Sequence, residues 1–226
     1  MAKPGSGHIE ASPSLAVKAY DELRRRIVDG ELGDRERLVI DRLSREFGIS
    51  VVPIREALAR LHAERLVELR PNYGYHVAAK PTSTDIRHWM EARLMIETTA
   101  AALAAERITD SSLAQLRVIN RKIAEGRFGA TARSFRPFIE LNHAFHVTIV
   151  EAAGNPHIAD LYRSLGYGPQ ISRTMVGRGV TDRDRIVAEH ERIIAALARR
   201  DAAKATEAVR RHIVDGLKRV QAMVED

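Results

Sequence analysis

The sequence predicts a mainly α-helical protein, with an N-terminal winged helix-turn-helix and a C-terminal all-α bundle of about six helices. Two observations predict this class. Residues 14–79 combine three helical patterns with a short hairpin pattern, whereas strand patterns vanish beyond residue 84 and helical periodicity takes over. We therefore expect a disordered tail at 1–13, a winged domain at 14–79, a linker at 80–84 and a helical domain at 85–226.

An amphipathic helix opens the winged domain. Its apolar residues recur at helical spacing, at Leu15, Ala19, Leu23 and Ile27. Arg24 and the two arginines that follow it are expected mostly outside this apolar face. We therefore expect one face of the helix to pack into the domain and the arginines to meet solvent or a partner.

Residues 43–61 are the most informative segment and predict two short helices joined by a tight turn. Gly48 can take the positive φ that ends the first helix, and Ser50 is a suitable N-cap for the second. Pro53 is tolerated in the first turn, where its missing N–H costs nothing. An apolar stripe then runs through Ile54, Leu58 and Leu61. This pattern is typical of a helix-turn-helix that enters a DNA major groove, although a plain helical hairpin shares it.

The segment after this motif favours DNA binding over a plain hairpin. Residues 66–77 predict two strands around a Pro-Asn-Tyr-Gly turn, and a β-hairpin directly after a helix-turn-helix is a wing. We expect double-stranded DNA as a partner. The candidate DNA-contacting residues are Arg24, Ser50, Val51, Val52, Arg55, Arg60, Asn72, Tyr73 and Gly74.

The composition is compatible with a DNA-binding protein but is not sufficient to predict one. The 226 residues have a net charge of +6 and a sequence pI near 9.9, and the basic excess is spread over both halves. The absence of cysteine excludes disulfides and thiolate chemistry. No apolar run approaches a membrane span, and the first residues lack the apolar core of a signal peptide, so we expect a cytoplasmic protein that does not contact a membrane.

Beyond the linker, periodicity predicts helices at about 84–106, 110–126, 131–153, 156–176, 182–200 and 202–224. Aspartate or asparagine lies at several expected helix starts, and glycine at several expected ends. The Gly-Tyr-Gly-Pro run at 166–169 should kink or interrupt the fourth of these helices.

Three histidines stand out because each shares a helix face with apolar residues. His146, His190 and His212 lie on three different predicted helices, where the bundle core should be. Asn142 precedes His146 by one turn. Convergent imidazoles of this kind are typical ligands for a divalent metal such as zinc, nickel or manganese, although each could instead be a hydrogen-bonded core histidine.

Two arginines could line the same bundle. Arg93 lies on a helix otherwise rich in apolar residues, and Arg173 follows the expected break. An inward arginine needs an anion, and a small carboxylate effector would serve through bidentate hydrogen bonds. A structural ion pair or a solvated arginine is the alternative for each; for Arg93 the obvious ion-pair partner is Glu97, four residues on.

The whole chain resembles a known family. The pattern Tyr-x-x-Leu-Arg at 20–24, the Pro-Ile-Arg-Glu-Ala-Leu run at 53–58 and the Gly-Tyr-x-Val run at 74–77 are similar to the winged-helix domain of GntR-family bacterial transcription regulators. The Asn-x-x-Phe-His run at 142–146, Gly-Asn-Pro at 154–156, Glu-His at 189–190 and His212 resemble the FCD ligand domain of the FadR subfamily. About six C-terminal helices would suit its VanR-like branch.

This resemblance implies a homodimer that binds a palindromic operator, most often as a repressor, and responds to a small carboxylate effector. It implies a metal held by Asn142, His146, His190 and His212, where Asn142 replaces the family's usual aspartate. It also implies that Arg55 reads the operator. Val51 stands where the family usually has an arginine, so the operator should differ from the common sequence, because valine can touch only a thymine methyl.

Two other functions compete with this one. A constitutive DNA-binding regulator would use the histidines as a structural core. A metal-dependent enzyme would activate water at an open metal position. The only carboxylate beside the histidines in sequence is Glu189, which we expect to face elsewhere, so we predict that the protein is not an enzyme.

Overall fold

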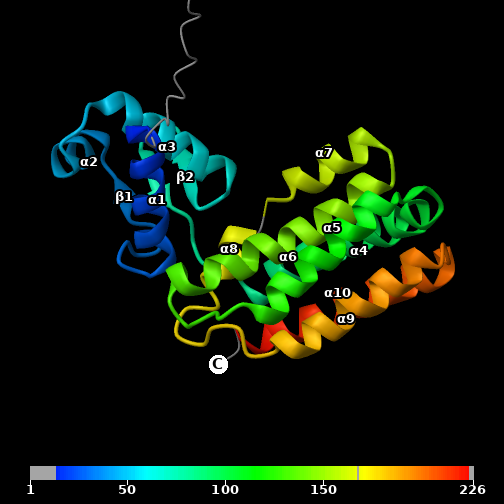
Figure 1. Ribbon diagram of the computed structural model, residues 1–226. Helices are drawn as coiled ribbons and strands as arrows, with labels where there is room; N and C mark the ends of the chain where they lie inside the picture. The colour runs from blue at the N-terminus through cyan, green and yellow to red at the C-terminus, as the bar shows by residue number, and fades with distance from the viewer. Residues whose placement is uncertain (1–13, 167, 224–226) are drawn as a thin grey trace, which may run out of the picture.

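The computed structural model describes residues 14–166 and 168–223, which form a small N-terminal domain and a larger helical domain (Figure 1). The expected tail at 1–13 lies outside the described residues. The N-terminal domain contains α1 (Leu15–Val28), β1 (Arg37–Leu38), α2 (Ile40–Phe47), α3 (Val51–Ala63), β2 (Val67–Arg70) and β3 (Gly74–Val77).

The N-terminal domain is the predicted winged helix-turn-helix. Strands β2 and β3 form the expected antiparallel hairpin, and β1, which the sequence patterns did not predict, adds a third strand in the order β1-β3-β2. Gly48 has φ of +64° and ends α2 in the left-handed region, as its lack of a Cβ allows. Ser50 is the N-cap of α3 by backbone conformation, although its side chain makes no capping hydrogen bond.

A hydrophobic core joins α1 to the helix-turn-helix. The fully buried side chains include Leu23, Ile27, Ile54, Leu58 and Leu61. They are the apolar stripes of α1 and α3 that periodicity predicted, now packed against each other. This packing leaves the opposite face of α3 at the surface.

The helical domain contains seven helices within the described residues: α4 (Ser83–Arg107), α5 (Asp110–Glu125), α6 (Ala132–Ala152), α7 (Pro156–Ser164), α8 (Gly168–Ser172), α9 (Arg183–Ala198) and α10 (Ala202–Ala222). The helix expected at 156–176 is interrupted, as the Gly-Tyr-Gly-Pro run predicted, although its second part ends at Ser172 and not near residue 176. Gly166, with φ of +51°, lies between α7 and α8, at the predicted break. The count is therefore six long or medium helices plus the five-residue α8.

Short polar side chains begin most of these helices. The N-cap side chains of Thr82, Thr109, Thr131, Asn155 and Asp201 each accept a hydrogen bond from a backbone N–H in the first turn. Thr82 and Asp85 form a complete capping box at the start of α4. Local sequence therefore determines where the long helices begin, and apolar packing determines how they associate.

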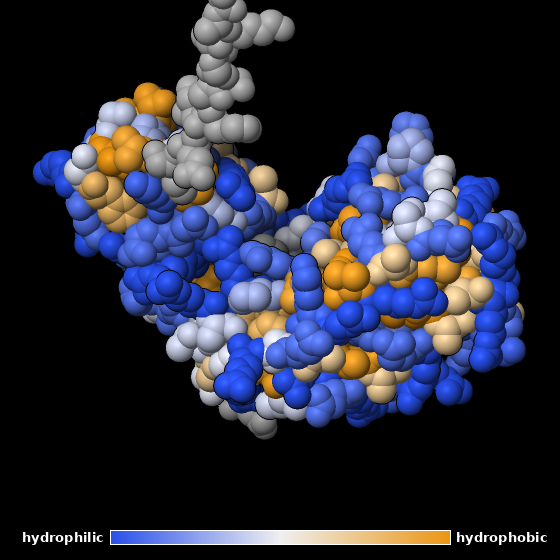
Figure 2. Space-filling model, viewed as in Figure 1, coloured by the Kyte–Doolittle hydropathy of each residue, from blue (hydrophilic) through white to orange (hydrophobic). Residues whose placement is uncertain are grey.

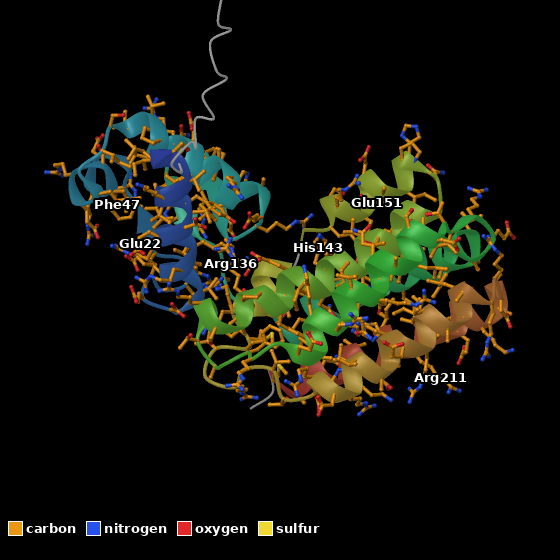
Figure 3. All side chains as sticks on the ribbon, viewed as in Figure 1. Glu22, Phe47, Arg136, His143, Glu151 and Arg211 are labelled. Carbon is orange, nitrogen blue, oxygen red and sulfur yellow. The ribbon has the colours of Figure 1, made fainter. Side chains whose placement is uncertain are left out.

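Helix α8 and the N-terminal end of α6 meet the N-terminal domain (Figure 1). Arg173, directly after α8, forms an ion pair with Asp34 and donates to the carbonyl of Ala78 at 2.7 Å. Gln170 of α8 donates to the carbonyl of Arg65. Figure 3 shows Arg136 of α6 between the two domains, where it bonds Asp21 of α1 at 3.0 Å.

Most of the visible surface is hydrophilic, with apolar side chains gathered mainly over the helical domain (Figure 2). None of the helices in the described ranges combines the length and apolar character needed to cross a bilayer.

Candidate metal and ligand site, and the DNA-binding surface

The exposed face of α3 and the tip of the wing carry most of the predicted DNA contacts. Val52 is 58% exposed, and Arg55 and Ser50 are exposed, while Val51 is half-buried. In the wing, Tyr73 is 67% exposed, and Asn72 and Gly74 have positive φ at the turn. An exposed face of this kind is what a helix needs in order to reach base edges in a major groove.

Two arginines of the predicted set are held within the domain. Arg24 was expected outside the apolar face, and this was wrong. It is buried, because α1 packs against α3 and brings its Nε to 3.7 Å from Oε2 of Glu64. Arg60 is half-exposed and lies over the ring of Tyr20, 3.8 Å from the ring centroid. The predicted set contains two arginines of α3, Arg55 and Arg60. Within the described residues, the structure shows no such internal contact for Arg55.

Three buried imidazoles converge in the helical domain. Helix α6 contributes His146, α9 contributes His190 and α10 contributes His212, and each residue is at most 5% exposed. One nitrogen from each ring lies within 4.8 Å of the others. The ring of Phe145 stacks on His190 at a centroid distance of 3.8 Å and fixes its plane. The sequence prediction that these three residues meet is confirmed.

Each imidazole has a different polar side chain beside its Nδ1. Nδ1 of His146 lies 2.7 Å from a carboxylate oxygen of Glu97, a close contact that falls short of good hydrogen-bond geometry. Nδ1 of His190 lies 3.1 Å from the amide oxygen of Asn120, and Nδ1 of His212 lies 2.8 Å from Glu189. Because all three partners are acceptors, they favour the tautomer with the proton on Nδ1. The lone pair on each Nε2 is then free to bind a metal.

Burial keeps these imidazoles neutral. It lowers the pKa of His146 to about 4, despite the opposing charge of Glu97, and it lowers the pKa of His190 and of His212 as well. Neutral imidazole is the form that binds a metal ion, so no proton has to be displaced from Nε2 at neutral pH.

The two carboxylates remain ionised. Burial alone would raise the pKa of Glu189, but hydrogen bonds from His212 and Arg219 lower it to about 2. Burial also raises the pKa of Glu97, but the charge of Arg93 and the contact with His146 outweigh it and hold that pKa well below the usual range. Both carboxylates therefore stay charged as acceptors for the imidazole Nδ1–H groups.

Unpartnered polar atoms show that this cluster fits a metal ion. Nε2 of His190 and Oδ1 of Asn142 are buried without hydrogen-bond partners. The Nε2 atoms of His146 and His212 lie 3.2 Å apart. That distance is close to the roughly 3.3 Å between two nitrogens on a tetrahedral zinc ion. The three histidines could therefore hold a divalent metal, and Asn142, which lines the same cavity one turn before His146, could add its amide oxygen.

The sequence patterns did not predict the roles of two residues that support the histidines. Glu189 was expected to face elsewhere, and this was wrong, because α10 lies beside α9 and brings His212 and Arg219 to its carboxylate. Asn120 was not singled out. It lies on the apolar stripe of α5, between Leu116 and Ile123, and a buried amide in such a stripe was the available signal.

A cavity of about 140 Å³ adjoins the histidine cluster. Its polar end includes His146, His212, Asn142 and Arg93, with His143 and Tyr162 nearby. Arg93 is buried and bonds Glu97 through Nε at 2.6 Å, as the sequence suggested, while its Nη2 has no hydrogen-bond partner of good geometry. The structure does not bring Arg173 to this cavity, because its guanidinium is bound to the N-terminal domain.

A winged helix-turn-helix joined to a helical domain with an internal cavity defines the class of DNA-binding transcription regulators that carry a separate sensor domain. Residues 15–77 match the model for bacterial regulatory proteins of the gntR family, and residues 88–215 match the FCD domain. The chain therefore belongs to the GntR-family transcriptional regulators with an FCD domain.

Characterised regulators resemble the chain over most of its length. The HTH-type transcriptional repressor GlaR of Escherichia coli (strain K12) is 25% identical over 211 residues, covering 91% of this chain and 96% of GlaR. The HTH-type transcriptional repressor RspR of the same strain is 27% identical over 194 residues, covering 86% and 83%. The solved structure of E. coli McbR/YncC shares the fold, with a TM-score of 0.69 at 19% identity and coverage of 93% and 99%. These relatives are regulators and not enzymes.

Proposed function

We propose that this regulator is ligand-responsive and acts as a repressor, and that its helical domain binds a divalent metal and a small carboxylate. One observation carries the proposal. Three neutral imidazoles, each with a different polar side chain beside its Nδ1, bring one ring nitrogen apiece within 4.8 Å of the others beside a cavity. The repressor assignment draws support from the relatives GlaR and RspR.

In this proposal the metal supplies a fixed positive centre for the carboxylate. His146, His190, His212 and Asn142 hold the ion. Asn142 brings no charge, so the site stays more positive than one with aspartate and favours an anionic ligand. Arg93 places its unpartnered Nη2 at the same end of the cavity, where it can donate to the carboxylate.

We infer that the ligand signal passes through α8. Gly168 and Ile171 of this short helix line the cavity, whereas Gln170 and Arg173 bond the N-terminal domain. A ligand that moves one side of α8 therefore changes the contacts on its other side. The ligand changes DNA binding only if its affinity differs between the arrangement of α8 that favours DNA binding and the arrangement that does not.

On DNA, a homodimer would place two α3 helices in successive major grooves of a palindromic operator, about 34 Å apart. Arg55, Val51, Val52 and the wing are the proposed contacts, and Arg60 adds charge beside them. The VanR-like branch stays a prediction, because the short α8 makes the helix count ambiguous.

Two variants test this function. His190→Ala should lose the metal and the ligand response but keep operator binding, whereas Arg55→Ala should lose specific operator binding and keep the metal. Metal per chain is measured by mass spectrometry, and DNA binding by titration of a labelled operator. Stoichiometric metal in His190→Ala would contradict the ligand set, and unchanged operator affinity in Arg55→Ala would contradict the role of α3. A wild-type protein that takes up no zinc, nickel or manganese would leave the histidines as a structural core.

A further inference from the structure

The wall of the cavity beyond the histidines is largely apolar. Helices α4, α6, α8, α9 and α10 all contribute to it, together with the segment between α8 and α9. Its large apolar members include Trp89, Phe138, Ile139, Met175, Ile186 and Val220. A ligand anchored at the polar end therefore has to place the rest of its body against hydrocarbon and aromatic rings.

The cationic groups of the lining lie beside the histidine cluster, because Glu97 joins Arg93 to His146 and Glu189 joins Arg219 to His212. Of the two arginines among the lining residues that the structure describes, Arg219 is fully engaged by Glu189 through two hydrogen bonds of 2.8 Å. Arg93 is the other, and it belongs to the polar end. Asp182 lines both this cavity and a neighbouring surface pocket, so it stands at the mouth and repels a second negative charge.

A second carboxylate or a row of hydroxyls would therefore be disfavoured. Burying a charge or a hydroxyl against apolar walls without a partner costs several kcal/mol. The cavity of about 140 Å³ also limits the size of the body. An engineered protein cavity of about 150 Å³ holds one benzene molecule, which sets the scale.

We propose that the cavity selects a monocarboxylate with a compact apolar body, of the size of one six-membered ring or a branched chain of about five or six carbons. This proposal rests on the carboxylate response proposed above and specifies its chemistry. The carboxylate lies at the Arg93, Asn142 and histidine end, and the apolar body lies between Trp89, Phe138 and Ile186. Dicarboxylates and polyhydroxylated acids are rejected by the apolar wall.

The chain contains one tryptophan, and it lines this cavity. The ring of Trp89 lies 5.0 Å from the guanidinium carbon of Arg93. Its fluorescence therefore reports directly on cavity occupancy, without DNA. Benzoate is the probe for the proposed class, malonate for dicarboxylates and gluconate for polyhydroxylated acids, each titrated into the zinc-loaded and the metal-free full-length protein.

We expect benzoate to change Trp89 fluorescence with a Kd at least tenfold lower than that of malonate or gluconate. Calorimetry should rank the three ligands in the same order of affinity.

A variant that fills the cavity tests whether benzoate binds there. A Cβ at Gly216 would meet its nearest atoms, in Met90 and Arg219, at 3.7 Å, so a side chain fits at its base and extends into the cavity. Gly216→Leu should weaken benzoate binding more than tenfold and Gly216→Ala less, while both retain zinc. Lys218→Leu, an exposed change on the same helix, is the matched control.

Malonate or gluconate binding as tightly as benzoate would overturn the proposal. So would the absence of any benzoate response in protein that binds zinc and operator normally. Gly216→Ala keeps the test valid if Gly216→Leu fails to fold. A failure of the proposed function would give a different result, because the protein would then take up no zinc or would not bind the operator. If zinc is not taken up, a preference of the metal-free protein for benzoate over malonate still supports the cavity's selectivity, and equal binding refutes it.

Discussion

Arg173 and Asp34 form an ion pair that joins the helical domain to the loop between α1 and β1. The guanidinium side chain is 1% exposed and the Asp34 side chain 42% exposed, so one partner is buried and the other reaches solvent. The same guanidinium donates to the carbonyl of Ala78, just after the wing. One side chain thus holds two separate segments of the DNA-binding domain.

Arg173→Ala should therefore loosen the two domains from each other. We expect a loss of about 2 kcal/mol of stability, the scale of hydrogen bonds to a charged group, and a smaller effect of ligand on operator affinity. Differential scanning calorimetry and operator titration with and without ligand measure these effects. Arg136→Ala, which removes the separate bond to Asp21, is the matched control at the other interdomain contact. An undiminished ligand response in Arg173→Ala would show that α8 does not carry the signal.

Asn120→Ala should weaken metal binding without removing a ligand. The amide oxygen positions His190 through Nδ1, and loss of such a supporting bond typically costs 10–100-fold in metal affinity. Competition with a calibrated chelator measures the change. Glu191→Gln is the conservative comparison, because glutamine keeps a side-chain oxygen that can accept from the Asn120 amide nitrogen and so leaves the amide in place. Unchanged zinc affinity in Asn120→Ala would mean that Phe145 stacking alone orients the ring.

Arg93→Lys should separate carboxylate binding from metal binding. Lysine keeps a positive charge beside Glu97 and so avoids an unpaired buried carboxylate, but it cannot offer the second planar nitrogen of a guanidinium. We expect roughly tenfold weaker benzoate binding by calorimetry, with zinc content unchanged. Benzoate affinity equal to wild type would remove Arg93 from the ligand site.

Val51→Arg should change the operator that the protein prefers. Valine at the start of α3 can contact only a thymine methyl, whereas arginine can bond guanine through two hydrogen bonds, worth about 1–3 kcal/mol of discrimination. Selection from randomised duplexes should enrich guanine at one symmetric position of each half-site for the variant and not for wild type. Arg55→Lys, selected in parallel, should relax preference at a different position. Identical operators for Val51→Arg and wild type would place residue 51 outside the interface.

Much of this architecture follows from local rules. The left-handed Gly48, the stripe through Ile54, Leu58 and Leu61, and the wing turn all lie where sequence patterns place them. The histidine cluster was also predictable, because each histidine shares a helix face with apolar residues and such faces turn toward the interior of a bundle. Helical periodicity therefore finds the residues that point inward.

The features that sequence patterns did not predict depend on which helices become neighbours. Hydrophobic periodicity contains no information about this. Glu189 precedes His190 by one residue and so lies on a different face of α9, yet α10 covers that face too. Arg173 points inward as expected, but into the contact with Asp34 and not into the cavity. The short β1 has only two residues, too few for an alternating pattern to be seen.

The histidine cluster has a further consequence for a chain that contains no cysteine. His146 lies on α6, whereas His190 and His212 lie on the consecutive helices α9 and α10, so an ion bound there would act as a removable cross-link between α6 and this helix pair. A cross-link of this kind closes long loops of the unfolded chain, as a disulfide does, and its strength scales with the free metal concentration. Metal scarcity would then loosen the helices that carry the histidines, and because the hydrophobic cores of the two domains are continuous, it would weaken the winged domain as well.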